Sequence, residues 1–190
     1  KQELVKSLAK KKKFHQLEFE VNSLLLEKRS PFLLNLLGVS KISKVPTSKK
    51  DLNESLDLFK EAYLKDKTLI DALFNYAEIS IRLLKYDEAK NLLIEYLSKK
   101  KYDYKATLAL ARIHFYLGNM DDCLLNYKKI IDNNEANSKL WSAFLFTTNY
   151  TYKYSQKDYL NFCNKYSEKL EKFDEKILKK FQYEKNPKKI

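Results

Sequence analysis

The sequence predicts an all-α fold, a solenoid of stacked helical hairpins, and three observations support this prediction. Side chains of similar size return every 34 residues along much of the chain. The 190 residues include only 2 Gly and 3 Pro, which leaves few tight turns and favours long helices with short connections. The composition is 44% hydrophobic and 33% charged, enough for a core, and no apolar run approaches the roughly 20 residues of a membrane span.

The 34-residue period is clearest at three small residues, Ser55, Ala89 and Cys123. Small side chains allow two helices to approach closely, so a hairpin can bury its apolar face against its neighbours. Larger and acidic residues keep the same step: Phe59, Leu93 and Tyr127; Ala62, Tyr96 and Ile130; Glu54, Glu88 and Asp122. The period therefore predicts that stability comes from stacking of equivalent hairpins.

Two segments, Leu84–Ala89 and Leu117–Cys123, resemble the turn and the second-helix start of the tetratricopeptide repeat (TPR), a helical hairpin of 34 residues. The resemblance implies a right-handed superhelix whose concave face consists of the first helix of each repeat. We expect a solenoid over 1–150, with a partial unit at 1–30, repeats at about 31–67, 68–101 and 102–135, and the first helix of a fourth at 138–150.

Two regions depart from the period. Gly38 and Ser55 are 17 positions apart where a regular repeat has 12, so 43–50 is expected to be a longer loop that holds five extra residues. After Tyr150 the pattern ends, and Ser155 followed by Asp158 predicts a helix N-cap. We expect a capping helix pair at 151–183 and a linker at 184–190. The apolar positions of the pair are Tyr159, Cys163, Tyr166, Leu170 and Phe173, then Ile177, Leu178 and Phe181.

The stretch 140–150, with its Asn149-Tyr150 end, followed by a Ser-capped amphipathic helix through Tyr166, resembles the end of the repeat region in bacterial SPINDLY-type, O-GlcNAc transferase-like glycosyltransferases. The resemblance implies an N-terminal arm that recruits acceptor proteins for a catalytic domain beyond Ile190, where the nucleotide sugar would bind. The start at Lys1 and the end after a basic pair also lead us to expect a piece of a longer chain. This chain itself is then expected to be non-catalytic and to hold no cofactor.

The candidate binding site is the predicted concave face, because helical spacing gathers polar and aromatic residues into two stripes there. A guanidinium can clamp a carboxylate or stack on an aromatic ring, so Arg82 and Arg112, together with Asn75, are the strongest candidates for contact with a polypeptide. The competing explanation is that Arg82 pairs with Glu78 one turn away. The two stripes are Asp71, Phe74, Asn75, Glu78, Ile81 and Arg82, and Lys105, Leu108, Ala109, Arg112, Phe115 and Tyr116.

Three other possibilities are consistent with the sequence. A stand-alone TPR adaptor is the main alternative. A net charge of +12 and the run Lys10–Lys13 suggest nucleic acid or an anionic surface, but only three of the 37 basic residues are arginines, and base recognition favours Arg. A homodimer through the terminal repeats stays open.

The residues that carry catalysis or metal binding are sparse. His15 and His114 lie far apart in sequence without metal-ligand spacing, and two cysteines cannot make a disulfide framework. Cys123 and Cys163 are expected to be inert packing thiols of a cytoplasmic protein.

Overall fold

The computed structural model describes the backbone of residues 2–43 and 45–178 and the side chains of residues 3–43 and 45–168. These residues form ten helices and no strand, which confirms the predicted all-α fold. The helices are α1 (Gln2–Lys10), α2 (Phe14–Glu27), α3 (Pro31–Ile42), α4 (Lys49–Lys65), α5 (Ile70–Arg82), α6 (Tyr86–Lys99), α7 (Tyr104–Tyr116), α8 (Met120–Asp132), α9 (Ser138–Thr148) and α10 (Gln156–Leu178).

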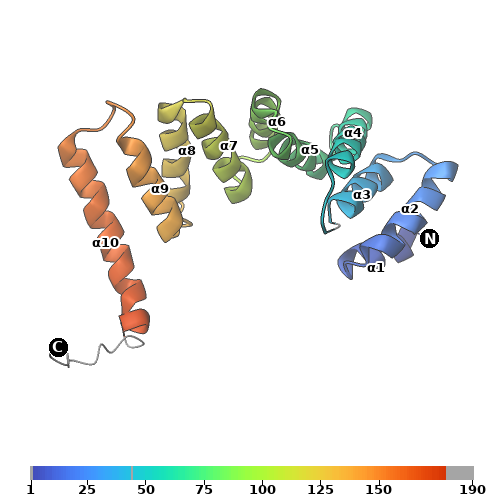
Figure 1. Ribbon diagram of the computed structural model, residues 1–190, viewed down its shortest axis with the longest axis horizontal. Helices are drawn as coiled ribbons and strands as arrows, with labels where there is room; N and C mark the ends of the chain where they lie inside the picture. Colours follow the sequence, from blue (N-terminus) through green and yellow to red (C-terminus); the bar gives the residue numbers. More distant parts are fainter. Residues whose placement is uncertain (1, 44, 179–190) are drawn as a thin grey trace, which may run out of the picture. The chain divides into compact units, whose positions relative to one another are not determined.

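The chain divides into an N-terminal unit, 1–117, and a C-terminal unit, 118–190, and each is described by itself. In the N-terminal unit each helix packs against the next one along the chain (Figure 1). In the C-terminal unit α9 packs against both α8 and α10. Contacts between neighbours in sequence are the pattern that stacked hairpins produce.

Side-chain caps fix the start of several helices. Ser30 accepts a hydrogen bond from the backbone N–H of Leu33, and Pro31 takes the first helical position, where its missing N–H costs nothing. Ser155 and Asp158 form the reciprocal capping pair before α10, with a distance of 3.2 Å from Asp158 N to Ser155 Oγ and of 2.9 Å from Ser155 N to Asp158 Oδ2. The cap predicted at Ser155 is therefore confirmed.

The turns before α6 and α8 use a left-handed residue instead of a side-chain cap. Leu84 has φ 61° and Gly118, 34 positions later, has φ 77°. The same backbone turn thus recurs with the period. Glycine adopts this conformation freely, whereas a leucine side chain strains it.

The three small residues that define the period, Ser55, Ala89 and Cys123, are all fully buried in the second helices α4, α6 and α8. Ala77 and Ala111 in the first helices are also fully buried. The larger residues predicted for the core lie there too, at 0–7% exposure: Phe59, Tyr76, Leu93, Tyr96, Tyr127 and Ile130.

Helices α3 and α4 approach each other closely at Gly38. A Cβ placed on Gly38 would lie 2.6 Å from Cε1 of Phe59, whose ring is fully buried in α4. One helical turn before Phe59 on α4, the hydroxyl of Ser55 donates a hydrogen bond to the carbonyl oxygen of the same Gly38 at 3.2 Å. A hydrogen atom at position 38 is therefore what allows α3 and α4 to pack at this distance.

Polar contacts tie the ends of successive second helices together. Arg29, just after α2, makes a bidentate ion pair with Glu61 of α4, with N–O distances of 2.9 and 2.6 Å. The hydroxyl of Tyr63 in α4 donates to Glu95 in α6, and Lys99 donates to the carbonyl oxygen of Lys67 at 2.9 Å. In all three contacts the partners lie 32 residues apart, so equivalent contacts recur from one repeat to the next. We call these three contacts the ladder.

The prediction of a loop over 43–50 is wrong at its end, because α4 begins at Lys49. Ser48 and Asp51 form a capping box that starts α4 three residues before the position equivalent to Tyr86 and Met120. The five extra residues therefore lengthen both the loop and the helix.

The C-terminal unit is held by an aromatic cluster between α9 and α10. Trp141 stacks on Tyr166 at a centroid distance of 5.9 Å, and Phe144 meets the face of Phe162 at 5.0 Å. The hydroxyl of Tyr166 reaches the backbone oxygen of Ser138, the first residue of α9, at 3.4 Å. Beyond that point α10 continues past the start of α9 (Figure 1).

The structure differs here from the expected pair of capping helices. Positions 177 and 178 belong to the same continuous helix as Tyr159 and Cys163, so these two members of the second apolar set fall on α10 with the first set. Phe181 and the expected linker, 184–190, lie outside the described residues.

Gly38→Ala should lower the free energy of unfolding by about 1–2 kcal/mol, because the added methyl group displaces the Phe59 ring and this cost exceeds the gain in helix propensity. Urea unfolding followed by circular dichroism measures the change. In a Phe59→Leu background the same substitution should cost clearly less. Equal costs in the two backgrounds would disprove the close contact.

Leu84→Gly should raise the free energy of unfolding by about 0.5 kcal/mol, because relief of the left-handed strain outweighs the extra chain entropy of glycine. Leu84 is 70% exposed, so little packing is lost. The matched control is Lys60→Gly, at an exposed residue inside α4 with ordinary helical backbone, which should be destabilising by about 1 kcal/mol. The two variants are compared in the same urea titration, and a loss of stability in both contradicts the assignment.

Acid should weaken the tie between Arg29 and Glu61. The hydrogen bond from Arg29, followed by that from Lys65, lowers the pKa of Glu61 to about 2 against the opposing effect of burial. A lowered carboxyl pKa stabilises the fold above the ordinary value of about 4.5, and this contribution is lost as the pH falls towards 2. The stability gap between wild type and Glu61→Gln, about 1 kcal/mol at pH 6 for a partly exposed pair, should shrink by pH 3 in urea titrations. A gap independent of pH would refute the contribution.

Candidate functional site

The main candidate site is a hollow of about 400 Å³ in the N-terminal unit, where α3, α5 and α7 meet. We call it the groove pocket. Helices α5 and α7 contribute most of it, because residues three, four and seven positions apart on a helix share one face. Its lining residues are Ile42 from α3, Glu78, Ile79, Ile81 and Arg82 from α5, and Lys105, Leu108, Ala109, Arg112, Ile113 and Tyr116 from α7.

The floor of the groove pocket is apolar and fixed. Ile79 is fully buried and Ile113 is 1% exposed, so both belong to the core and cannot move away from the pocket. Leu108 and Ile81 are half-buried above them. A ligand side chain that covers this floor removes apolar surface from water, which favours binding.

Three cations surround this floor, and all three side chains are exposed: Arg82, Lys105 and Arg112. Among the side chains that the structure describes, none of these three is within ion-pair distance of a carboxylate, whereas Arg29, Lys41 and Lys65 all are. The expected contact between Arg82 and Glu78 is thus not formed as an ion pair. The pocket carries positive charge that the fold itself does not neutralise by contact.

Glu78 is the only acidic residue of the groove pocket. Partial removal from water by the surrounding helices raises the pKa of Glu78 above its ordinary value, and the nearby charges of Lys105 and Arg82 oppose this rise. These cations therefore act on Glu78 from beyond contact distance. The side chain of Glu78 is nevertheless exposed to solvent.

Tyr116 forms an aromatic wall at one side of the pocket. Its ring stacks on Tyr86 with a centroid distance of 5.2 Å and an interplanar angle of 19°, and it meets Phe115 edge-on at 6.2 Å. Tyr116 is nevertheless 62% exposed. The two contacts hold the ring in place while a large part of its surface stays available to a ligand.

The groove pocket brings together six of the ten residues predicted for the binding site: Glu78, Arg82, Lys105, Leu108, Arg112 and Tyr116. It also includes Ile81 and Ala109 from the predicted stripes. The other four predicted residues lie outside it: Asp71, Phe74, Asn75 and Phe115.

These four residues have other positions in the fold. Phe74 packs its ring against Tyr96 at 5.2 Å, and Asp71 is exposed in the first turn of α5. The side-chain amide of Asn75 donates to Oδ1 of Asn35 in α3 at 2.9 Å. This hydrogen bond links the first helices α3 and α5, so the side-chain NH2 group of Asn75 is already used within the protein.

Sequence reasoning missed three residues of the groove pocket: the buried core residues Ile79 and Ile113, and Ile42. Ile42 precedes Ile81 by 39 positions, which is one period of 34 plus the five extra residues of the second repeat. Ile42 and Ile81 thus occupy equivalent positions once the longer loop is counted. Correcting the register for that loop would have found Ile42.

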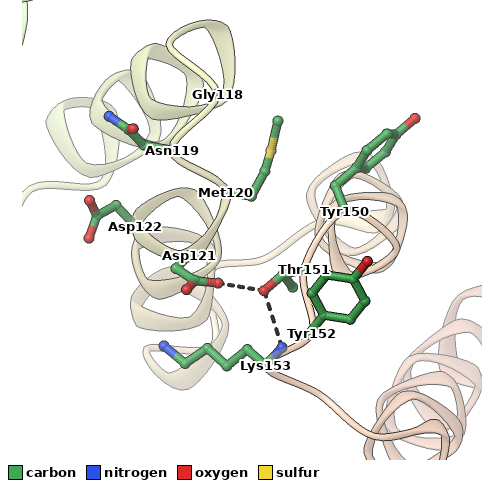
Figure 2. A pocket seen from close by; sticks show the side chains of 9 residues that line it. All are labelled: Gly118, Asn119, Met120, Asp121, Asp122, Tyr150, Thr151, Tyr152 and Lys153. Carbon is green, nitrogen blue, oxygen red and sulfur yellow. Dashed lines mark hydrogen bonds between the residues drawn. The ribbon is translucent and has the colours of Figure 1, made fainter.

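A second hollow, of about 710 Å³, lies in the C-terminal unit between the start of α8 and the loop after α9 (Figure 2). Of its two acidic residues, Asp121 and Asp122, the first accepts a hydrogen bond from the hydroxyl of Thr151 at 2.5 Å, and Thr151 accepts one from the backbone N–H of Lys153 at 3.2 Å. Tyr150 and Tyr152 border it and are exposed. These hydrogen bonds account for Asp121 as a link that fixes the loop to α8.

Over the described residues, no group of three or more His, Cys, Asp or Glu side chains has the arrangement of a metal site. His15 is exposed in α2 and His114 is buried in α7. Burial raises the pKa of the Cys123 thiol to about 11, so this thiol is protonated at neutral pH and fills space in the core. Cys163 is half-buried in α10.

The helices described by the structure include none that is both long enough and apolar enough to cross a membrane.

Comparison with known proteins identifies the fold. No protein-family model matches the chain, and no curated protein does either. A crystal structure of MamA matches with a TM-score of 0.73 over 97% of this chain and 94% of that chain, at 16% identity. MamA 41-end from Desulfovibrio magneticus RS-1 matches with a TM-score of 0.71 over 88% of this chain and 91% of that chain, at 13% identity. At such identities the likeness concerns the fold alone, which is a TPR-like helical solenoid.

Proposed function

We propose that this chain is a non-catalytic scaffold that binds a polypeptide segment in the groove pocket. The observation that carries the proposal is the combination of a fixed apolar floor with exposed cations that make no ion-pair contact within the described structure. Cations left in this state over apolar surface are available for a ligand, because no internal contact has to break first. A protein-interaction role also fits the TPR-like fold.

A polypeptide suits the pocket better than a nucleic acid does. A phosphate backbone needs a track of cations, and here Glu78 stands among Arg82 and Lys105. Other basic side chains of the N-terminal unit are engaged in ion pairs, such as Lys41 with Glu18 and Glu54. The lysines 10–13 lie at the end of α1 and in the turn before α2, away from the groove pocket.

Two settings are compatible with this binding activity. One is a stand-alone adaptor, and the other is the acceptor-recruiting arm of a protein O-glycosyltransferase. The second rests on the sequence of 140–166 alone, and the comparisons add no support to it. In that setting the nucleotide sugar would bind beyond Ile190. A cytoplasmic location and a homodimer are likewise proposals.

The test is selection of peptides from a random 12-residue library on the purified chain, followed by site-specific photo-crosslinking. A benzoylphenylalanine in place of Tyr116 should crosslink to the selected peptides, because this ring forms the wall of the groove pocket. Mass spectrometry locates the crosslink.

The matched control places the same amino acid at Leu64, which is 60% exposed on α4 and outside the groove pocket. Crosslinking at Tyr116 without crosslinking at Leu64 supports the proposal. Equal crosslinking at both positions, or the absence of any selected peptide, rejects it.

A further inference from the structure

We infer that the groove pocket selects segments in which a carboxylate stands next to an apolar side chain, and that Glu78 acts against such ligands as a built-in competitor for its cations. This inference rests on the proposed function and specifies its ligand class. It follows from three features of the pocket: the placement of its cations, the nature of its floor and wall, and the position of its one carboxylate.

The three cations line the same pocket from two helices. Lys105 and Arg112 are seven residues apart on α7, two helical turns, so they lie on the same face. Arg82 reaches the same pocket from the end of α5. A ligand carboxylate can therefore approach cations from two helices, and a guanidinium binds a carboxylate with two parallel hydrogen bonds.

The floor and wall require that the ligand be apolar as well as anionic. Ile79 and Ile113 close the floor, Leu108 lies over it, and the ring of Tyr116 stands at the side. A small inorganic anion would leave this surface exposed to water. A side chain such as Leu or Phe next to the carboxylate would cover the surface and add its burial to the electrostatic attraction.

Glu78 opposes the binding of acidic ligands. It lies in the pocket with Arg82 and Lys105 near enough to lower its pKa, yet not in ion-pair contact with them. A ligand carboxylate that reaches these cations is repelled by Glu78. Removal of this one negative charge should therefore tighten the binding of acidic ligands, the reverse of what loss of a ligand-binding residue normally does.

The experiment measures the selected peptides and a panel of four variants by fluorescence anisotropy at 0.1 M salt. The selected peptides should be enriched in Asp or Glu beside Leu, Ile or Phe, and replacement of their acidic residues by the matching amides should weaken binding about 10-fold. Arg82→Gln and Arg112→Gln should each weaken binding about 3- to 10-fold, whereas Glu78→Gln should tighten it about 3-fold.

The control variant is Lys85→Gln, which removes one exposed positive charge outside the pocket and should leave the affinity unchanged. Circular dichroism verifies that each variant keeps its helices, which is expected since all four side chains are exposed. A fluorescent 12-residue oligothymidine serves as the nucleic-acid probe.

The outcomes separate the inference from the proposed function. Peptides that crosslink at Tyr116 but are neutral or basic, or that bind equally after amide replacement, overturn the inference and leave the scaffold proposal intact. An unchanged or weaker affinity of Glu78→Gln also overturns it. Oligothymidine that binds and displaces the selected peptides, with loss on Arg112→Gln, overturns it in favour of nucleic acid. Absence of any groove-pocket crosslink rejects both.

Discussion

The structure depends on close contact between helices at positions where the side chain is small. Gly38 against Phe59 is one example, and Ser55, Ala89 and Cys123 are further small residues, fully buried at 34-residue intervals. At such distances backbones and side chains interdigitate, so each hairpin buries the apolar face that it cannot bury alone. Every later feature, including the groove pocket, follows from the spacing that these contacts impose.

Repetition then determines which surfaces remain open. The ends of successive second helices are linked to each other by the ladder, which includes the contacts of Arg29 with Glu61 and of Tyr63 with Glu95. The first helices α3, α5 and α7 border the groove pocket, and among their described side chains one comparable polar contact, from Asn75 to Asn35, joins two of them outside the pocket. Polar groups on the second helices are therefore used for stability, whereas cations on the first helices remain available to a ligand.

The net charge of the chain does not show which of its basic residues can bind a ligand. A net charge of +12 suggests an anionic partner of any kind, yet Lys41 is paired with Glu54 of the next helix and Lys65 with Glu61 of its own helix. In the groove pocket positive charge coincides with apolar surface and with the stacked ring of Tyr116, and on this combination we base the proposal of a ligand that is both acidic and apolar. The fold alone does not define a function, so the proposed binding role rests on the residues of the pocket.

The sequence by itself determined the all-α class, the period, the core residues such as Phe59 and the cap at Ser155, because these depend on local propensity and on spacing along one helix. Only the tertiary structure decided which members of the predicted stripes meet. Asn75 turns to Asn35 and Phe74 packs on Tyr96, while Ile42 enters the pocket from α3. Such choices depend on the distance and rotation between helices, which side-chain packing sets and helical periodicity does not encode.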